Sequence, residues 1–399
     1  MNRQTSAVWL VVIAAFAALA STANAASLTG PFEAAVERSA EIKALLARMP
    51  EQALKRDATG ALLPGGWSVS VSTESDALTT GRGAREVATE AAFPIWLPGE
   101  RGATAHAADH ALLALEAELA RKRMEIARIV RDAYREFAEA REKLSLAERR
   151  LAIARTLAAD TRRRVSAGQA AEVDALIAEA ELSDAEAAVA ARRGELNEAL
   201  VQFDGRTGLR PPASFSEEIG RRAGTHPTVI ALTAAVSKAE SERHLVEVVD
   251  RDRPEFALTT KTDRGDRDEA YNTQIGARVK IPFAYDAVNA PKRASADGAI
   301  IAAKAELNAA ERMIKSEVAK ARAKLDGARK QLAALEKRHT QLSSAVVLIE
   351  KSQQAGQTSL SELIRARVQM FDAANSRALA RIAVERAKSE INQAQGIEP

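Results

Sequence analysis

Residues 126–158 read IARIVRDAYREFAEAREKLSLAERRLAIARTLA, and residues 314–346 read IKSEVAKARAKLDGARKQLAALEKRHTQLSSAV. In both stretches apolar residues recur at alternating spacings of four and three. In the first stretch these seam positions are Ile126, Val130, Ala133, Phe137, Ala140, Leu144, Ala147, Leu151, Ala154 and Ala158. In the second they are Ile314, Val318, Ala321, Leu325, Ala328, Leu332, Leu335, His339, Leu342 and Val346. A heptad pattern kept for this length predicts helices that pack along one face as a coiled coil.

The two stretches belong to a longer internal duplication with an offset of 188 residues. The register holds without a gap from residue 94 to residue 178. Phe93-Pro94-Ile95 aligns with Ile281-Pro282-Phe283, and Ala167-Gly168-Gln169 aligns with Ala355-Gly356-Gln357. Self-similarity at a fixed offset indicates that the chain consists of two copies of one structural unit.

Each unit is expected to contain a helical rod that ends at a glycine. Residues 105–167 contain neither proline nor glycine, and at about 1.5 Å per residue such a helix spans about 95 Å. Gly168 and Gly356 follow the two rods, and glycine is a common helix stop because it tolerates positive φ. Second helices are predicted over residues 170–201 and 359–393, so that each unit forms an antiparallel helical hairpin.

Before each rod, two runs of sequence alternate with the period of a β-strand. In the second unit the apolar face carries Ile275, Ala277, Val279, Ile281 and Phe283, and in the first Val87, Thr89, Ala91, Phe93 and Ile95. The preceding runs are Trp67/Val69/Val71 and Phe256/Leu258/Thr260. Each unit is therefore predicted to have a β-hairpin with strands of about 9 to 11 residues, the length that crosses a bilayer at a tilt.

Aromatic residues favour membrane strands over the alternative, a soluble sheet with one hydrated face. The aromatic fraction of the chain is only 4%. In or beside the four runs lie Trp67, Phe93, Trp96, Phe256, Tyr271, Phe283 and Tyr285. Aromatic girdles mark the two interfaces of a membrane β-barrel.

Composition and the N-terminus limit the class of protein. Residues 1–25 have the basic start, apolar centre and Ala23-Asn24-Ala25 cleavage site of a secretory signal peptide, which predicts export. The chain has no cysteine, which excludes disulfides and a lipoprotein anchor. A net charge of +3 with 28% charged residues argues against nucleic acid as a partner.

The pattern predicts a linear order of segments. These are a signal peptide (1–25), an N-terminal helical segment (26–66), a first β-hairpin (67–97), a first long helical hairpin (98–206), connector helices (207–254), a second β-hairpin (255–285) and a second long helical hairpin with the C-terminus (286–399).

Four strands cannot close a barrel, and lipid does not tolerate an open sheet edge. We therefore expect closure by other copies of the chain. Lys261, Gln274, Arg278 and Lys280 lie on the polar strand face and need water, which favours twelve strands around an aqueous lumen over eight around a filled interior. The expected assembly is a homotrimer in which the helical hairpins continue the barrel as a tube about 100 Å long.

With the turn motifs included, the sequence resembles the TolC family of outer-membrane efflux ducts over essentially the whole mature chain. The motifs are Gly356-Gln357-Thr358-Ser359-Leu360-Ser361-Glu362-Leu363 and the looser run from Gly168 to Ala175, where Ala171 replaces the serine. The run Phe93–Arg101 looks most like members that serve heavy-metal or drug pumps of the resistance-nodulation-division type, including the cobalt-zinc-cadmium resistance protein CzcC.

This resemblance implies a mainly α fold with a small β part. The duplicated unit of β-hairpin plus coiled-coil helical hairpin trimerises into an outer-membrane β-barrel, which a periplasmic α-helical barrel continues. It also implies a passive conduit in outer-membrane lipid, with an inner-membrane pump and a periplasmic adaptor at the helical tips. Alternatives are the outlet of a type I protein secretion system and, from another class, an exported coiled-coil scaffold.

The resemblance further places functional residues at the two tips. Adaptor docking is expected at Gly168, Gln169, Gly356, Gln357 and Ser359. The periplasmic gate is expected at Glu362, Arg365 and Asp174. Relatives carry a second acidic residue where this chain has Arg365, so a purely acidic entrance ring is in doubt. An ion pair between Glu362 and Arg365, at i and i+3, is the alternative.

No residue pattern predicts catalysis, a cofactor or a metal site. His106 and His110 share a helix face, but zinc sites use three or four ligands, so a solvated helix start is favoured. His339 occupies a seam position and is expected to be a satisfied polar residue, whereas His226 precedes Pro227 and is expected to be a helix cap. The chain lacks a G-x-S-x-G motif and a Walker loop, which argues against an enzyme.

Overall fold

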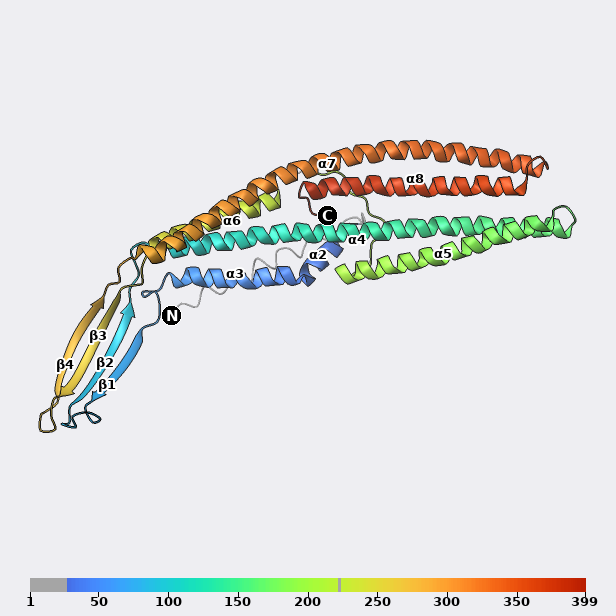
Figure 1. Cartoon of the computed structure of the whole chain (residues 1–399). Helices are drawn as coiled ribbons and strands as arrows, with labels where there is room; N and C mark the ends of the chain where they lie inside the picture. The colour runs from blue at the N-terminus through green and yellow to red at the C-terminus, as the bar shows by residue number, and fades with distance from the viewer. Residues whose placement is uncertain (1–26, 222–223) are drawn as a thin grey trace, which may run out of the picture.

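The computed structural model describes residues 27–221 and 224–399, so the predicted signal peptide lies outside the described residues. The chain is an elongated molecule with a β-sheet at one end and two helical hairpins reaching to the other (Figure 1). The elements are α2 (Thr29–Arg38), α3 (Ala40–Ala58), β1 (Ser68–Ser75), β2 (Arg85–Pro94), α4 (Glu100–Ser166), α5 (Glu172–Thr207), α6 (Pro227–Val248), β3 (Glu255–Arg264), β4 (Asn272–Lys280), α7 (Asp286–Gln354) and α8 (Leu360–Ala394).

The four strands form one antiparallel sheet in the order β1-β2-β3-β4. The central pair, β2 and β3, joins the hairpins of the two repeats, with Ala91 opposite Leu258. The predicted β4 extended to Phe283, but the strand ends at Lys280. Pro282 has no N–H for a strand ladder, which accounts for the early end.

The two rods are longer than the sequence pattern predicts. Helix α4 begins at Glu100 instead of residue 105 and has 67 residues, which at about 1.5 Å each gives about 100 Å. The Glu100 carboxylate explains the early start, because its Oε2 accepts the N–H of Leu97 at 2.9 Å. Arg253 pairs with the same carboxylate at 2.7 Å, although Glu100 is only 1% exposed. Helix α7 has 69 residues.

The heptad seam of the first rod is confirmed as its buried face. Val130, Ala133 and Phe137 pack against Phe203 on α5, and Leu144, Leu151 and Ala154 pack against Ala185 and Val189 farther along the same helix. Alanines on both helices permit close approach of the two backbones. In the second repeat Ala321 and Leu325 pack with Val384, Ala387 and Ile391 on α8.

The connector, which the sequence predicts to be helical over residues 207–254, is only partly helical. Helix α6 begins only at Pro227, and it lies between α4 and α7 near the sheet (Figure 1). The predicted cap role of His226 is confirmed, since its Nδ1 accepts the N–H of Thr228 at 3.1 Å. Among the residues that the structure describes, no helix is both long and apolar enough to cross a membrane.

At the middle of the molecule, one buried arginine joins segments that are far apart in the sequence. Arg131 on α4 is 1% exposed and contacts Glu217 at 2.6 Å. The same guanidinium donates to Gln393 Oε1 at 2.7 Å and to the carbonyl of Ile397 at 3.0 Å. These bonds attach the connector and the C-terminal residues to the first rod.

Candidate functional site

The two helical tips have the same backbone geometry. Gly168 has a φ of 72° and Gly356 a φ of 75°, in the left-handed region that glycine adopts without strain. The N–H of Gln169 bonds to the carbonyl of Arg164 at 2.7 Å, and the N–H of Gln357 to that of Ser352 at 3.0 Å. This six-residue closure is the Schellman motif, so each rod ends in a defined turn.

The chain leaves the two turns differently. Ser359 is the N-cap of α8, and its hydroxyl accepts the N–H of Glu362 at 3.2 Å. The Ser352 and Thr358 hydroxyls hydrogen-bond across the second turn at 2.5 Å. Ala171 is the N-cap of α5 and forms no side-chain cap. An N-cap serine contributes about 1 kcal/mol to helix stability, so the second tip has local support that the first lacks.

An ion pair joins rod and return helix above each tip. Arg162 on α4 contacts Glu179 on α5 and also reaches Glu172 at 3.2 Å. In the second repeat Glu350 on α7 contacts Arg367 on α8. With the 188-residue offset, Glu350 corresponds to Arg162 and Arg367 to Glu179. The same contact is thus present in both repeats with its charges exchanged.

The predicted gate residues lie on the first turns of the return helices. Glu362 and Arg365 are exposed on α8, and Asp174 is half-buried at the corresponding position of α5. Their neighbours Leu360 and Leu363 are buried, which fixes the orientation of this first turn. The expected pair between Glu362 and Arg365 is absent from the ion pairs of the described residues, so both charges are available to other partners.

The predicted lumen residues share one face of the sheet. Gln274 lies opposite Lys261, Arg278 opposite Ala257, and Lys280 opposite Glu255. Lys261 pairs with Glu86 on β2 at 2.7 Å, Arg278 pairs with Glu90 across β3, and Lys280 lies 3.8 Å from Glu255. The charged groups therefore lie together on a single polar face.

The opposite face is apolar and largely uncovered. Ile275 is 83% exposed and Val279 59% exposed. Phe93 lies opposite Phe256 in the β2–β3 register and stacks on Trp67 with ring centroids 6.3 Å apart. A face of this composition is suited to lipid, with aromatic side chains at one interface.

The structure places His106, His110 and His339 in different surroundings. His106 is exposed and His110 half-buried, and no cluster of three potential ligands occurs in residues 27–221 and 224–399. His339 is half-buried in the seam, where its Nδ1 lies 3.2 Å from a guanidinium nitrogen of Arg377. Burial, and then the charge of Arg377, lower the pKa of His339.

The chain is similar to known outer-membrane channels in part of its sequence and in its fold. Residues 33–208 match the model of the family described as outer membrane efflux protein. The matched residues make up less than half of the chain. The chain is an outer-membrane efflux channel with a periplasmic extension. The match spans the first repeat, whose rod and tip correspond to those of the second.

Solved outer-membrane channels share the fold of this efflux protein. The VceC protein of Vibrio cholerae is 15% identical, with a TM-score of 0.72 over 92% of this chain and 96% of that one. The CmeC channel of Campylobacter jejuni is 14% identical, with a TM-score of 0.72 over 92% and 85%. The open-state MtrE channel of Neisseria gonorrhoeae is 16% identical, with a TM-score of 0.70 over 92% and 88%. No curated protein sequence matches the chain.

The ion pairs at the two tips were not among the contacts predicted from the sequence. A signal was present in the duplication, because Arg162 aligns with Glu350 and Glu179 aligns with Arg367. A charge reversal at two aligned positions indicates that the two residues interact. The two residues of each pair are 17 positions apart in the sequence, and the turn between the helices brings them into contact.

Proposed function

We propose that three copies of this efflux channel close a twelve-stranded barrel and act as the exit duct of a tripartite pump. The observation that carries this proposal is the four-stranded sheet with two open edges, β1 and β4. Open edges are not tolerated in lipid, and the apolar sheet face provides the surface that lipid would cover. Pairing of β1 with β4 of the neighbouring copy satisfies both edges and creates a closed ring.

Cysteine cross-linking tests the proposed closure, because the natural chain has no cysteine. A cysteine replacing Val71 on β1 is combined with one replacing Thr273, Ile275, Ala277 or Val279 on β4. We expect one register to give a covalent trimer on oxidation in mild detergent, and each single variant to give none. Cross-linked species limited to dimers would contradict the trimer.

The polar sheet face is proposed to line the lumen and to favour cations. Its acidic side chains are Glu74, Glu86, Glu90, Glu255 and Asp263, and its basic side chains are Lys261, Arg278 and Lys280. The acidic excess is repeated three times in a trimer and attracts cations into a narrow pore. Glu74 and Asp263 form no ion pair among the described residues, although both carboxylates interact with the more distant charge of Lys261.

Planar-bilayer recording tests the lumen assignment. A double variant with Glu74→Gln and Asp263→Asn removes two negative charges from the polar face without breaking an ion pair. We expect the cation preference, measured as the reversal potential in a salt gradient, to fall. Asp268→Asn in the β3–β4 loop is the matched control and is expected to leave the potential unchanged. Equal potentials in all three channels would contradict the assignment.

We further infer that the exported substrates are heavy-metal cations delivered by a resistance-nodulation-division pump. Two observations support this substrate class: the resemblance of Phe93–Arg101 to members that serve heavy-metal or drug pumps, and the acidic excess of the proposed lumen, which favours cations among these substrates. Deletion of the gene is expected to increase sensitivity to zinc, cobalt or cadmium ions, with restoration by the wild-type gene. Sensitivity only to drugs and detergents, or loss of a secreted protein, would contradict the metal assignment.

The tips are proposed to meet the adaptor through Gly168, Gln169, Gly356, Gln357 and Ser359, and the gate to lie beside them. Since neither Glu362 nor Arg365 forms an ion pair among the described residues, contacts between copies would hold the entrance closed. Each exposed pair contributes only about 0.2 to 1 kcal/mol, so several together would bias a marginal equilibrium.

The gate is tested by charge reversal at Arg365. Arg365→Glu adds repulsion around the threefold axis and is expected to raise single-channel conductance and sensitivity to large antibiotics. Arg365→Gln separates loss of attraction from added repulsion and should give a smaller increase. Wild-type conductance and salt dependence in Arg365→Glu would remove Arg365 from the gate.

A further inference from the structure

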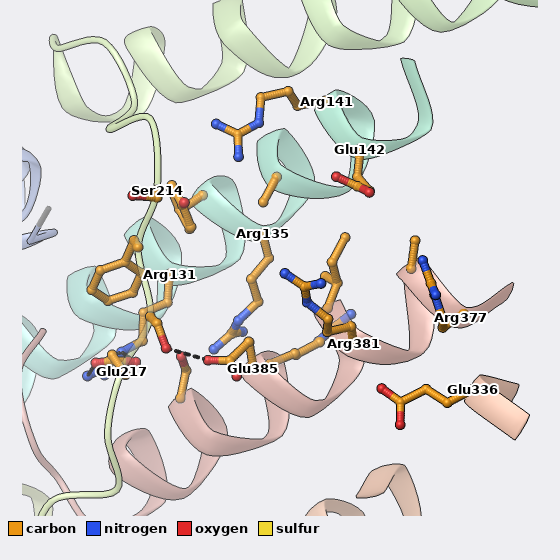
Figure 2. Close-up of a pocket in the computed structure, with 18 residues that line it drawn as sticks. Arg131, Arg135, Arg141, Glu142, Ser214, Glu217, Glu336, Arg377, Arg381 and Glu385 are labelled. Carbon is orange, nitrogen blue, oxygen red and sulfur yellow. Dashed lines mark hydrogen bonds and ion pairs between the residues drawn. The ribbon is translucent and has the colours of Figure 1, made fainter. Parts of the chain in front are cut away.

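A cavity of about 360 Å³ lies between α4, α8 and the connector, away from the tips and the sheet (Figure 2). Six arginines line it: Arg131, Arg135 and Arg141 from α4, and Arg377, Arg381 and Arg386 from α8. Four glutamates also line it: Glu142, Glu217, Glu336 and Glu385. Positive charge is therefore in excess around a space large enough for a small organic molecule.

The charges are unevenly paired, and the unpaired ones are mainly arginines. Arg131 and Arg386 pair with Glu217 and Glu390. Within the described part of the chain, no carboxylate lies at ion-pair distance from three of the arginines. These are Arg141, Arg377 and Arg381. Arg141 donates to the carbonyl of Ala213, and a guanidinium nitrogen of Arg377 lies 3.2 Å from Nδ1 of His339.

The Arg135 guanidinium is largely buried and lies near two other arginines, Arg131 and Arg386. Its side chain is 13% exposed and pairs with Asp132 at 2.7 Å. Burial lowers the pKa of Arg135; the carboxylates of Asp132 and Glu390 oppose this shift, and the charges of Arg386 and Arg131 add to it. Figure 2 shows Arg135 and Arg381 projecting from α4 and α8 into the space between these helices.

Glu142 and Glu336 limit where an anion can bind, because their charges are not neutralised by a close ion pair. Glu217 and Glu385 are already occupied, by Arg131 and by Lys388 with Ser216. Glu336 has no ion pair in the described residues, and Glu142 has only a 3.9 Å contact with Arg149. In Figure 2 Glu336 lies away from Arg135, on the side of the cavity where Arg377 is drawn. An anionic group is therefore best placed near Arg135 and Arg381.

The remaining wall is apolar and partly aromatic. Tyr134 and Phe215 meet edge to face with ring centroids 5.3 Å apart, and Ala138 and Ile382 complete this side. A simple inorganic ion would leave this surface unused. The wall suits a ligand that carries an apolar or aromatic body beside its charged group.

We propose that this cavity binds a small organic anion whose phosphate or carboxylate group is held by Arg135 and Arg381, with Arg377 and Arg141 beside them. Guanidinium groups bind both oxyanions through two parallel N–H bonds, which explains the preference for arginine. Because α4 belongs to the first repeat and α8 to the second, the bound ligand would connect the two hairpins. The proposal goes beyond the duct function and does not depend on its cargo.

Isothermal titration calorimetry of the detergent-solubilised channel with phenyl phosphate tests the proposal. We expect saturable binding at about one site per protomer, and a loss of affinity of about tenfold or more in Arg381→Gln and in Arg377→Gln. Arg312→Gln, at an exposed position of α7, is the matched control and should bind as the wild type does. Far-UV circular dichroism and gel filtration show whether each variant is folded and assembled.

Three further probes separate the contributions of charge and ring. Inorganic phosphate should bind more weakly than phenyl phosphate because it lacks the body that contacts Tyr134 and Phe215. Benzyl alcohol and benzyltrimethylammonium carry the ring without the anion and should not bind at this site. Absence of saturable phenyl phosphate binding, equal affinity in Arg381→Gln, or equal binding of the cation would overturn the proposal. Efflux and trimer assembly are measured separately, so failure here would leave the duct function intact.

Discussion

Glu217→Gln tests the contact that attaches the connector to the first rod. In the native protein three of the guanidinium contacts of Arg131, at 3.2, 3.1 and 2.6 Å, go to the Glu217 carboxylate. The two others go to neutral acceptors on Gln393 and Ile397. Glutamine has the same size but no charge, so the substitution leaves a guanidinium that is 1% exposed without a counter-ion.

The expected loss of stability follows from this burial. Removing one partner of a buried pair costs about 3 to 5 kcal/mol, and the retained amide oxygen places Glu217→Gln at the lower end, about 3 kcal/mol. The loss is measured by urea unfolding followed by far-UV circular dichroism, at fixed protein and detergent concentrations because assembly contributes to the apparent stability.

A neighbouring residue and a double variant provide the controls. Glu218 is exposed and uses only its backbone carbonyl, which accepts from Asn392, so Glu218→Gln should change stability by less than about 0.5 kcal/mol. Replacing Arg131 by Met together with Glu217 by Leu removes both charges and should cost less than Glu217→Gln alone. If Glu217→Gln and Glu218→Gln have equal effects, the buried pair does not secure the connector.

Three other predictions concern the sheet, the turn and the seam. Val279→Lys on the apolar sheet face should prevent assembly, with a cost of about 2 to 4 kcal/mol at mid-membrane, whereas Gln274→Lys should be tolerated; equal trimer yields on gel filtration would contradict the membrane face. Gly356→Val forces a branched side chain to a φ of 75°, so efflux should fail although trimers still reach the membrane; full resistance in this strain would argue against docking at the tip. Since the pKa of His339 is lowered, the folded state should lose stability as the pH falls below about 6.5, and in urea titrations His339→Leu should weaken that dependence.

The periodic parts of the fold were predictable because they repeat along the chain. The heptad positions from Val130 to Ala158 predicted a buried seam, and strand alternation placed Lys261 and Arg278 on one face. A shift of one residue would have exchanged the two faces of each strand, so the strand assignment had a strong internal check. The stop at Gly168 was predictable for the same reason, since its counterpart Gly356 has the same backbone conformation.

Contacts between distant segments were not predictable from periodicity. The predicted connector helices (207–254) include Glu217, but this residue lies in an irregular segment before α6 and pairs with Arg131, 86 residues earlier. The pair between Glu362 and Arg365 was allowed by helical spacing yet does not form within the chain. Long flexible side chains have many rotamers, and spacing alone does not choose among them. The arginine-lined cavity depends on how α8 packs against α4, which no local pattern encodes.

The exchanged charges above the two tips allow the repeats to be told apart during folding. The rods have similar seams, so each return helix has two candidate partners in the same chain. Packing α8 on α4 at this height would place Arg367 beside Arg162, and packing α5 on α7 would place Glu179 beside Glu350. Both mismatches set like charges against each other, and only the native combination pairs opposite ones. A duplicated chain can thus acquire self-recognition from two charge reversals, without any change in its hydrophobic pattern.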